Sequence, residues 1–129
     1  MRSIFVASLA MLCSPALLAV PIPASQRAEI DALMAVLQTS ACKFNRNDSW
    51  HSAAEAKTHL LRKLEYLEGK NAVQSTEQFI ELGASKSSLS GRAYQVKCGN
   101  AAAIDSKSWL STQLKLIRST GRSDLQLTK

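Results

Sequence analysis

Two cysteines in the body of the chain restrict its fold more than any other feature of the sequence. Of the three cysteines, Cys13 lies in an N-terminal segment that we expect to be removed, which leaves Cys42 and Cys98. An even pair in an exported protein is most simply a disulfide. A metal or redox pair is the alternative, but it lacks a nearby Cys-x-x-Cys or Cys/His spacing. The sequence therefore predicts a Cys42–Cys98 disulfide, which closes a long loop and contributes about 4 kcal/mol in the chain-entropy model.

The N-terminal segment has the features of a signal peptide. Arg2 is followed by an apolar stretch from Ile4 to Val20, and small residues surround Ala19 and Ala24. We expect cleavage after Ala24, with a cut after Ala19 as the alternative. An uncleaved membrane anchor is less favoured, because the stretch is short for a membrane span and contains a proline. The sequence thus predicts a signal peptide over 1–24, no transmembrane segment after its removal, and a single small periplasmic domain over 25–129.

The charge of that domain is mildly positive. The chain has 16 Lys and Arg against 10 Asp and Glu, and only one of these charges, on Arg2, belongs to the expected signal peptide. The basic residues are scattered and do not alternate with aromatic ones, which argues against nucleic-acid binding. An acidic protein partner or an anionic envelope surface is compatible with the charge.

The apolar pattern predicts about four helices and a small two-stranded β element, a mainly α fold of the α+β class. Helical spacing of apolar residues predicts the helices, and Ser52 and Ser75 each precede a Glu or Gln three residues later, as in a capping box. Gly69 is expected to end the second helix. The helices are expected from about 25 to 39–41, from 52 to 69, from 75 to 83 and from 105 to 118. The extended pieces are expected at 42–46 and 93–98, joined by the disulfide, and a polar C-terminal tail is expected from 119.

Three groups of side chains are candidates for function. Glu55, His59 and Arg62 share one ridge of the second helix, where the carboxylate could raise the pKa of the histidine for acid–base work. The structural alternative is that Glu55 serves the capping box and His59 borders the core. A metal site is not expected, because His51 and His59 form no known ligand motif.

The serine-rich loop at 85–91 is the second group. It lacks the glycine-rich turn of a P-loop and the order of an SxxK motif. The simplest interpretation is a polar surface loop, whose hydroxyls and Lys86 could also face a partner.

The aromatic residues near the disulfide are the third group. Phe44 and Tyr94 are expected in the core, whereas Trp50 lies between polar neighbours and is expected to be partly exposed. Trp and Arg are frequent anchors of protein interfaces, so Arg46 and Trp50 form a candidate patch.

Several short pieces, taken together, resemble the YfeK-like family of small bacterial periplasmic proteins, a domain of unknown function. These pieces occur in order at Cys42–Asn47, Glu55–Leu60, Glu77–Ile80, Ala84–Gly91 and Tyr94–Cys98. The resemblance covers about Ile30 to Trp109 and implies a location in a Gram-negative envelope. It also implies recurring roles for Arg46, Asn47, Glu55, His59, Lys63 and the Ser85–Gly91 loop.

We expect a protein-binding module of inhibitor or immunity type, with a protein partner in the cell envelope and no cofactor. An envelope accessory or small-ligand carrier is one alternative, and a small hydrolase using His59 and a serine of the 85–90 loop is another. An enzyme is the less favoured class, because no catalytic set is assembled in the sequence. The candidate binding surface consists of Arg46, Asn47, Trp50, Glu55, His59, Lys63, Lys86, Ser87, Ser88 and Ser90.

Overall fold

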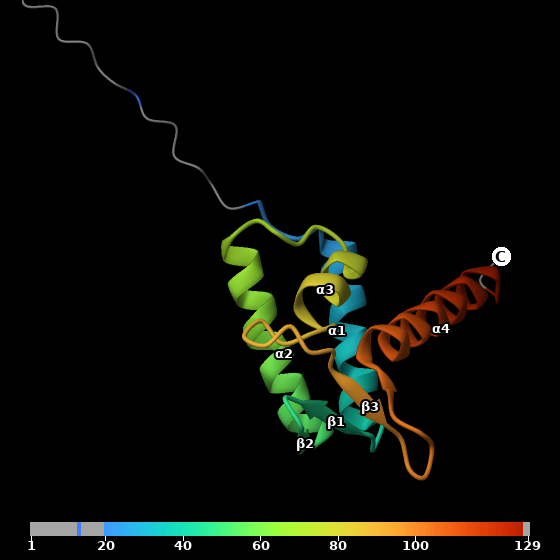
Figure 1. The fold of residues 1–129 in the computed structure, drawn as a ribbon. Coiled ribbons are helices and arrows are strands. Elements are labelled where there is room, and N and C mark those ends of the chain that lie inside the picture. The colour runs from blue at the N-terminus through green and yellow to red at the C-terminus, as the bar shows by residue number, and fades with distance from the viewer. Residues whose placement is uncertain (1–12, 14–19, 128–129) are drawn as a thin grey trace, which may run out of the picture.

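The computed structural model describes residue 13 and residues 20–127 (Figure 1). The expected signal peptide therefore lies almost entirely outside the described residues. Four helices pack together with a small sheet at one end of them (Figure 1), which confirms the mainly α fold. The elements are α1 (Ala24–Thr39), β1 (Lys43–Arg46), β2 (Ser49–His51), α2 (Ala53–Gly69), α3 (Thr76–Gly83), β3 (Gln95–Lys97), β4 (Ile104–Asp105) and α4 (Ser106–Leu127).

Helix α1 is the centre of the core. Its apolar stripe of Ile30, Leu33, Met34 and Leu37 is completely buried, because the other three helices all pack against it. This burial, rather than intrinsic propensity, provides most of the stability of such a helix.

The sheet has four antiparallel strands in the order β2-β1-β3-β4, whereas the sequence predicted two. The predicted strands correspond to β1 and β3, which pair directly. Strand β2 pairs with β1 across a two-residue turn, in which Asn47 and Asp48 have φ values of 51° and 66°. Positive φ at both positions is the requirement of a type I′ hairpin turn, and Asn and Asp tolerate it. Strands β2 and β4 span only three and two residues. Strands of this length are too short to be recognised from an alternation of apolar and polar residues.

The disulfide joins the start of β1 to the end of β3. Cys42 and Cys98 are bonded across 56 positions, which confirms the predicted pair, and Cys13 is free. On the inner face of the sheet, the ring of Phe44 packs edge-to-face on Trp109 of α4, with ring centroids 5.8 Å apart. The covalent bond and this aromatic pair fix the sheet against the helices.

Helix ends follow the predicted caps, with two differences. The Ser52 and Ser75 hydroxyls accept the backbone N–H groups three residues later, at 3.2 and 3.1 Å. The Glu55 carboxylate, however, bonds to the ring of His51 at 3.0 Å. Helix α2 ends at Gly69, as predicted, but the left-handed residue of its Schellman motif is Asn71, with a φ of 55°.

The polar segment from Ser119 is the last part of α4, which continues to Leu127. The prediction that the last helix ends near 118 was therefore wrong. Arg118 anchors the middle of α4, because its guanidinium bonds to Glu29 of α1 at 2.9 and 2.8 Å and pairs with Glu77 of α3 at 2.6 Å. The helix thus extends past the core, and its far end projects from the molecule (Figure 1).

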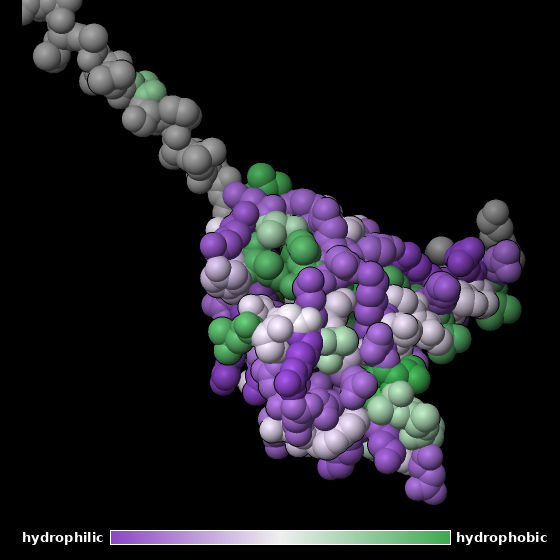
Figure 2. All heavy atoms as spheres, viewed as in Figure 1, coloured by the Kyte–Doolittle hydropathy of each residue, from purple (hydrophilic) through white to green (hydrophobic). Residues whose placement is uncertain are grey.

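The face of the molecule in Figure 2 is mostly hydrophilic, and some of its apolar residues gather on the projecting loop before β4. That loop and the start of β4 expose Ala101, Ala102, Ala103 and Ile104. Within the part of the chain that is described, no helix combines the length and apolar character that crossing a membrane requires.

Candidate functional site

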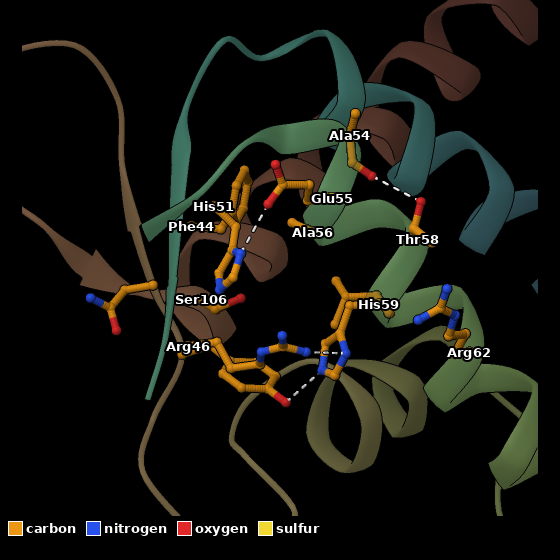
Figure 3. Close-up of a pocket in the computed structure, with 13 residues that line it drawn as sticks. Phe44, Arg46, His51, Ala54, Glu55, Ala56, Thr58, His59, Arg62 and Ser106 are labelled. Carbon is orange, nitrogen blue, oxygen red and sulfur yellow. Dashed lines mark hydrogen bonds and ion pairs between the residues drawn. The ribbon is translucent and has the colours of Figure 1, made fainter. Parts of the chain in front are cut away.

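A groove runs between α2, the β1–β2 hairpin and the serine-rich loop. It consists of two hollows of about 510 and 460 Å³, which share Arg46, His51, His59 and Tyr94. Figure 3 shows the first hollow, with His51 close to Glu55 and Arg46 close to His59. We call this feature the donor groove, because Arg46, His59 and Lys63, which line it, all donate hydrogen bonds.

The groove is built from three elements. Arg46 ends β1 on the inner face of the sheet, since its side chain alternates with Asn45 and shares a face with Phe44. His59 and Lys63 lie one turn apart on α2, so both point from the same ridge. Tyr94 precedes β3, and its ring is buried with only 6% of the residue exposed.

Hydrogen bonds determine the tautomer of His59. An Arg46 Nη1–H donates to Nδ1 of His59 at 2.5 Å. A guanidinium can only donate, so Nδ1 carries no proton and the neutral ring is protonated at Nε2. Nε2–H therefore donates to the Tyr94 hydroxyl oxygen at 3.0 Å (Figure 3).

Lys63 completes this polar cluster. Its Nζ donates to the Tyr94 hydroxyl at 3.2 Å and to the backbone carbonyl of Lys86 at 2.9 Å. It also lies 5.0 Å from the centre of the Tyr94 ring. The hydroxyl oxygen of Tyr94 thus accepts two hydrogen bonds, and its own proton has no acceptor among the described residues.

Burial and positive neighbours shift the protonation of the cluster. Partial burial, the Arg46 guanidinium and the Lys63 ammonium lower the pKa of His59 to about 4. Burial and the charge of Arg46 also lower the pKa of Lys63, and burial raises the pKa of Tyr94. At neutral pH the cluster contains two cations, a neutral imidazole and a neutral phenol.

The candidate pairing of Glu55 with His59 is not formed, and the structural alternative fits better. The Glu55 carboxylate bonds to His51, and the pKa of His59 is lowered where the sequence suggested that it would be raised. Residues one turn apart on a helix can meet, but His51 at the end of β2 lies closer to the carboxylate. The apolar pattern did not indicate β2, and it therefore did not indicate this competing partner.

The serine-rich loop is tied to the hairpin turn. The Asn47 amide donates to Ser87 Oγ at 3.2 Å, and its carbonyl oxygen accepts the Ser90 hydroxyl at 2.5 Å. The Ser87 residue is only 4% exposed, and its hydroxyl accepts the backbone N–H groups of Leu89 and Ser90 at 3.3 Å. The loop is therefore a defined structure, with Leu89 at 96% exposure.

The structure brings together most of the predicted surface, and separates some members from it. Arg46, Asn47, His59, Lys63, Ser87 and Ser88 line the second hollow. Lys86 and Ser90 lie beside it but do not line it. Trp50 is 46% exposed, as expected, but it pairs with Asn45 and so lies on the opposite face of the sheet from Arg46. The predicted patch of Arg46 with Trp50 is thus wrong.

Tyr94 is the member of the site that sequence reasoning missed. The alternation around β3 placed it in the core, which is correct for its ring. Its hydroxyl nevertheless reaches the groove, as tyrosine often combines an apolar body with a polar tip. Across the described residues, no three His, Cys, Asp or Glu side chains are grouped so that they could hold a metal ion.

Comparisons with known proteins agree with the resemblance found in the sequence. Residues 24–118 match the family model described as "Family of unknown function (DUF5329)". A protein of Salmonella typhimurium, described as "Uncharacterized protein YfeK", is 38% identical over 72 residues. This match covers 55% of the present chain and 58% of the relative, less than two thirds of its length. No solved structure matches the chain. Because the family model spans most of the sequence and the whole groove, the chain belongs to the DUF5329 family of unknown function.

Proposed function

We propose that this chain is an exported binding module that recognises a protein partner in the cell envelope. The contact surface would consist of the donor groove and the serine-rich loop beside it. The export follows from the N-terminal sequence and the disulfide, since such bonds persist in oxidising compartments. An inhibitor or an immunity protein is the kind of module that this scaffold suits.

The observation that carries the proposal is the exposure of Leu89 on a loop that is held in place. An apolar side chain with 96% exposure has no role in the core. The loop around it is fixed by the bonds of Ser87 and Asn47, so little conformational entropy would be lost on binding. Leu89 also lines the same hollow as Arg46 and Tyr94, and Arg and Tyr are residue types that are enriched in interface hot spots.

The geometry does not support the hydrolase alternative. Both ring nitrogens of His59 are already bonded, to Arg46 and to Tyr94. Ser87 is buried and bonded to backbone N–H groups, and a histidine with a pKa of about 4 is a weak base at neutral pH. The small-ligand carrier remains a second candidate, because hollows of about 510 and 460 Å³ fall in the range of ligand sites.

A photo-crosslinking experiment in the native host tests the proposal. A photoreactive phenylalanine analogue would replace Leu89, and a matched control would carry it at Leu116, an exposed leucine on α4 (57% exposed). We expect a discrete protein adduct from position 89 that is absent from position 116. The adduct should be lost when Asn47→Gly loosens the loop. Adducts of equal yield at both positions, or none at position 89, would contradict the proposal.

A further inference from the structure

Three side chains that line the second hollow have hydrogen-bond donors that no described residue accepts. The guanidinium of Arg46 has five N–H groups, of which one is used, on His59. The ammonium of Lys63 has three, of which two are used, on Tyr94 and on the carbonyl of Lys86. The Tyr94 hydroxyl proton adds a further donor, because both bonds to its oxygen come from other groups.

Glu55 lines the first hollow of the groove, but its carboxylate is paired with His51. The second hollow is lined by no Asp or Glu. The carboxylates closest in the sequence are occupied, since Glu55 pairs with His51 and Asp48 pairs with Arg92. Among the ion pairs of the described residues, none involves Arg46 or Lys63. Two neighbouring cations that are partly buried without a counter-ion are unfavourable, and a bound anion would relieve this.

We infer that the donor groove binds an oxyanion, with Arg46 and the Tyr94 hydroxyl donating to its oxygens and Lys63 supplying the second positive charge. Carboxylates and phosphates share this chemistry, and the planar fork of a guanidinium suits both. The inference rests on the proposed function only in that the same groove is the binding site.

The shape of the groove indicates how the anion would arrive. The hollow opens beside Ser88 and Leu89, both of which line it and are exposed. An anionic group at the end of a larger ligand can therefore reach the cations while its apolar part contacts Leu89. The neutral tautomer of His59 serves as a positioning group, because it accepts from Arg46 and donates to Tyr94.

The test is a titration followed by two-dimensional NMR of the purified domain, with chloride as the constant background salt. The probes are N-acetylglutamate amide, the matched N-acetylglutamine amide, and inorganic phosphate. We expect saturable shifts of the backbone amides at Arg46, His59, Lys63 and Tyr94 with glutamate or phosphate, and none with glutamine. Tighter binding of the glutamate probe would indicate a side-chain carboxylate as the source, and tighter binding of phosphate would indicate a phosphate group.

Two variants and one control make the test specific. Arg46→Gln retains a donor for His59 but removes the charge, and Tyr94→Phe removes the free O–H donor. Each should weaken anion binding roughly tenfold, as expected for a lost charge-assisted hydrogen bond. Lys115→Gln removes the same charge from α4 outside the groove, and should change the affinity by less than about twofold.

Absence of saturable shifts with both oxyanions would overturn the inference. So would an equal weakening by Lys115→Gln and Arg46→Gln, because the effect would then be general attraction to a basic protein. If anions bind but position 89 never forms an adduct, the inference stands and the protein partner is wrong. If adducts form but no anion binds, the protein partner stands and the anion site is wrong.

Discussion

At the scale of single residues, the site depends on His59 remaining neutral. Its ring is held between a donor, Arg46, and an acceptor, the Tyr94 hydroxyl. A proton on Nδ1 would face the guanidinium directly, so protonation would break the Arg46 contact. Partial burial and this electrostatic conflict together explain a pKa near 4.

Stability should therefore fall as the pH drops from 6.5, the ordinary histidine pKa, to about 4. In this range the unfolded chain takes up a proton at His59 that the folded protein resists, so the free energy of unfolding decreases. Because the ring is only partly buried, we expect a loss of about 1 kcal/mol. Urea unfolding across this pH range, with His59→Gln as the comparison, measures the loss in the free energy of unfolding. Gln retains an acceptor and a donor without titrating, so an unchanged pH slope in the variant would contradict the assignment.

Asn47 has two functions, in the hairpin turn and in the loop contact. Asn47→Gly keeps the positive φ of the turn and removes the bonds to Ser87 and Ser90. We expect a loss of about 1–2 kcal/mol and faster hydrogen exchange at Leu89 and Ser90. The control Ser88→Ala alters an exposed neighbour and should change neither quantity. Equal exchange rates in the two variants would show that Asn47 does not hold the loop.

At the scale of elements, the sequence predicted the helices well because their signals are local. The stripe of α1 and the caps of α2 and α3 depend on residues only a few positions apart. The strands were less predictable, since β2 and β4 are short and exist only through their partners. The site followed the same rule. The position of His59 on a ridge of one helix was visible in the sequence, and Lys63 was indicated by the family resemblance. The contacts of Tyr94 and His51, however, depend on the tertiary fold.

The length of α4 was the other error, because its polar end has no apolar stripe. Gly121→Ala tests the observed helix, since a new Cβ there would meet nothing within 4 Å. Alanine should stabilise the helix by about 0.5–1 kcal/mol, seen as increased helical circular dichroism. Gly83→Ala in α3 is the contrast, because its Cβ would lie 2.9 Å from the Phe79 ring. We expect that change to cost about 1–3 kcal/mol. A neutral Gly121→Ala would mean that the chain is not helical there.

At the scale of the whole molecule, the disulfide determines how the sheet is held. It links the residue before β1 to the residue after β3. Arg46 is the last residue of β1, and Tyr94 directly precedes β3. Stabilisation by such a bond acts mainly through the unfolded chain. Most of the core comes from the four helices, and Cys42, Phe44, Tyr94 and Val96 pack the sheet against them.

Replacing both cysteines, Cys42→Ser with Cys98→Ser, should lower the free energy of unfolding by up to about 4 kcal/mol. Chemical denaturation of the oxidised domain and of the double variant measures the difference. Dithiothreitol should destabilise the domain with native cysteines to the same extent and leave the double variant unchanged. If the reductant has no effect on the native domain, the bond is not formed in the isolated protein.

The most direct test of the donor groove is ¹⁵N NMR of the His59 imidazole, recorded at neutral pH and at a pH midway between 4 and 6.5. The structure predicts the neutral Nε2–H tautomer in both samples, because Arg46 donates to Nδ1 and the pKa lies near 4. An Nδ1–H tautomer, or a protonated ring at the lower pH, would contradict it. Arg46 would then not be held in place by His59, and with the Nδ1–H tautomer the Tyr94 hydroxyl would donate to Nε2 instead of to a ligand. The proposed anion site would thus lose its basis.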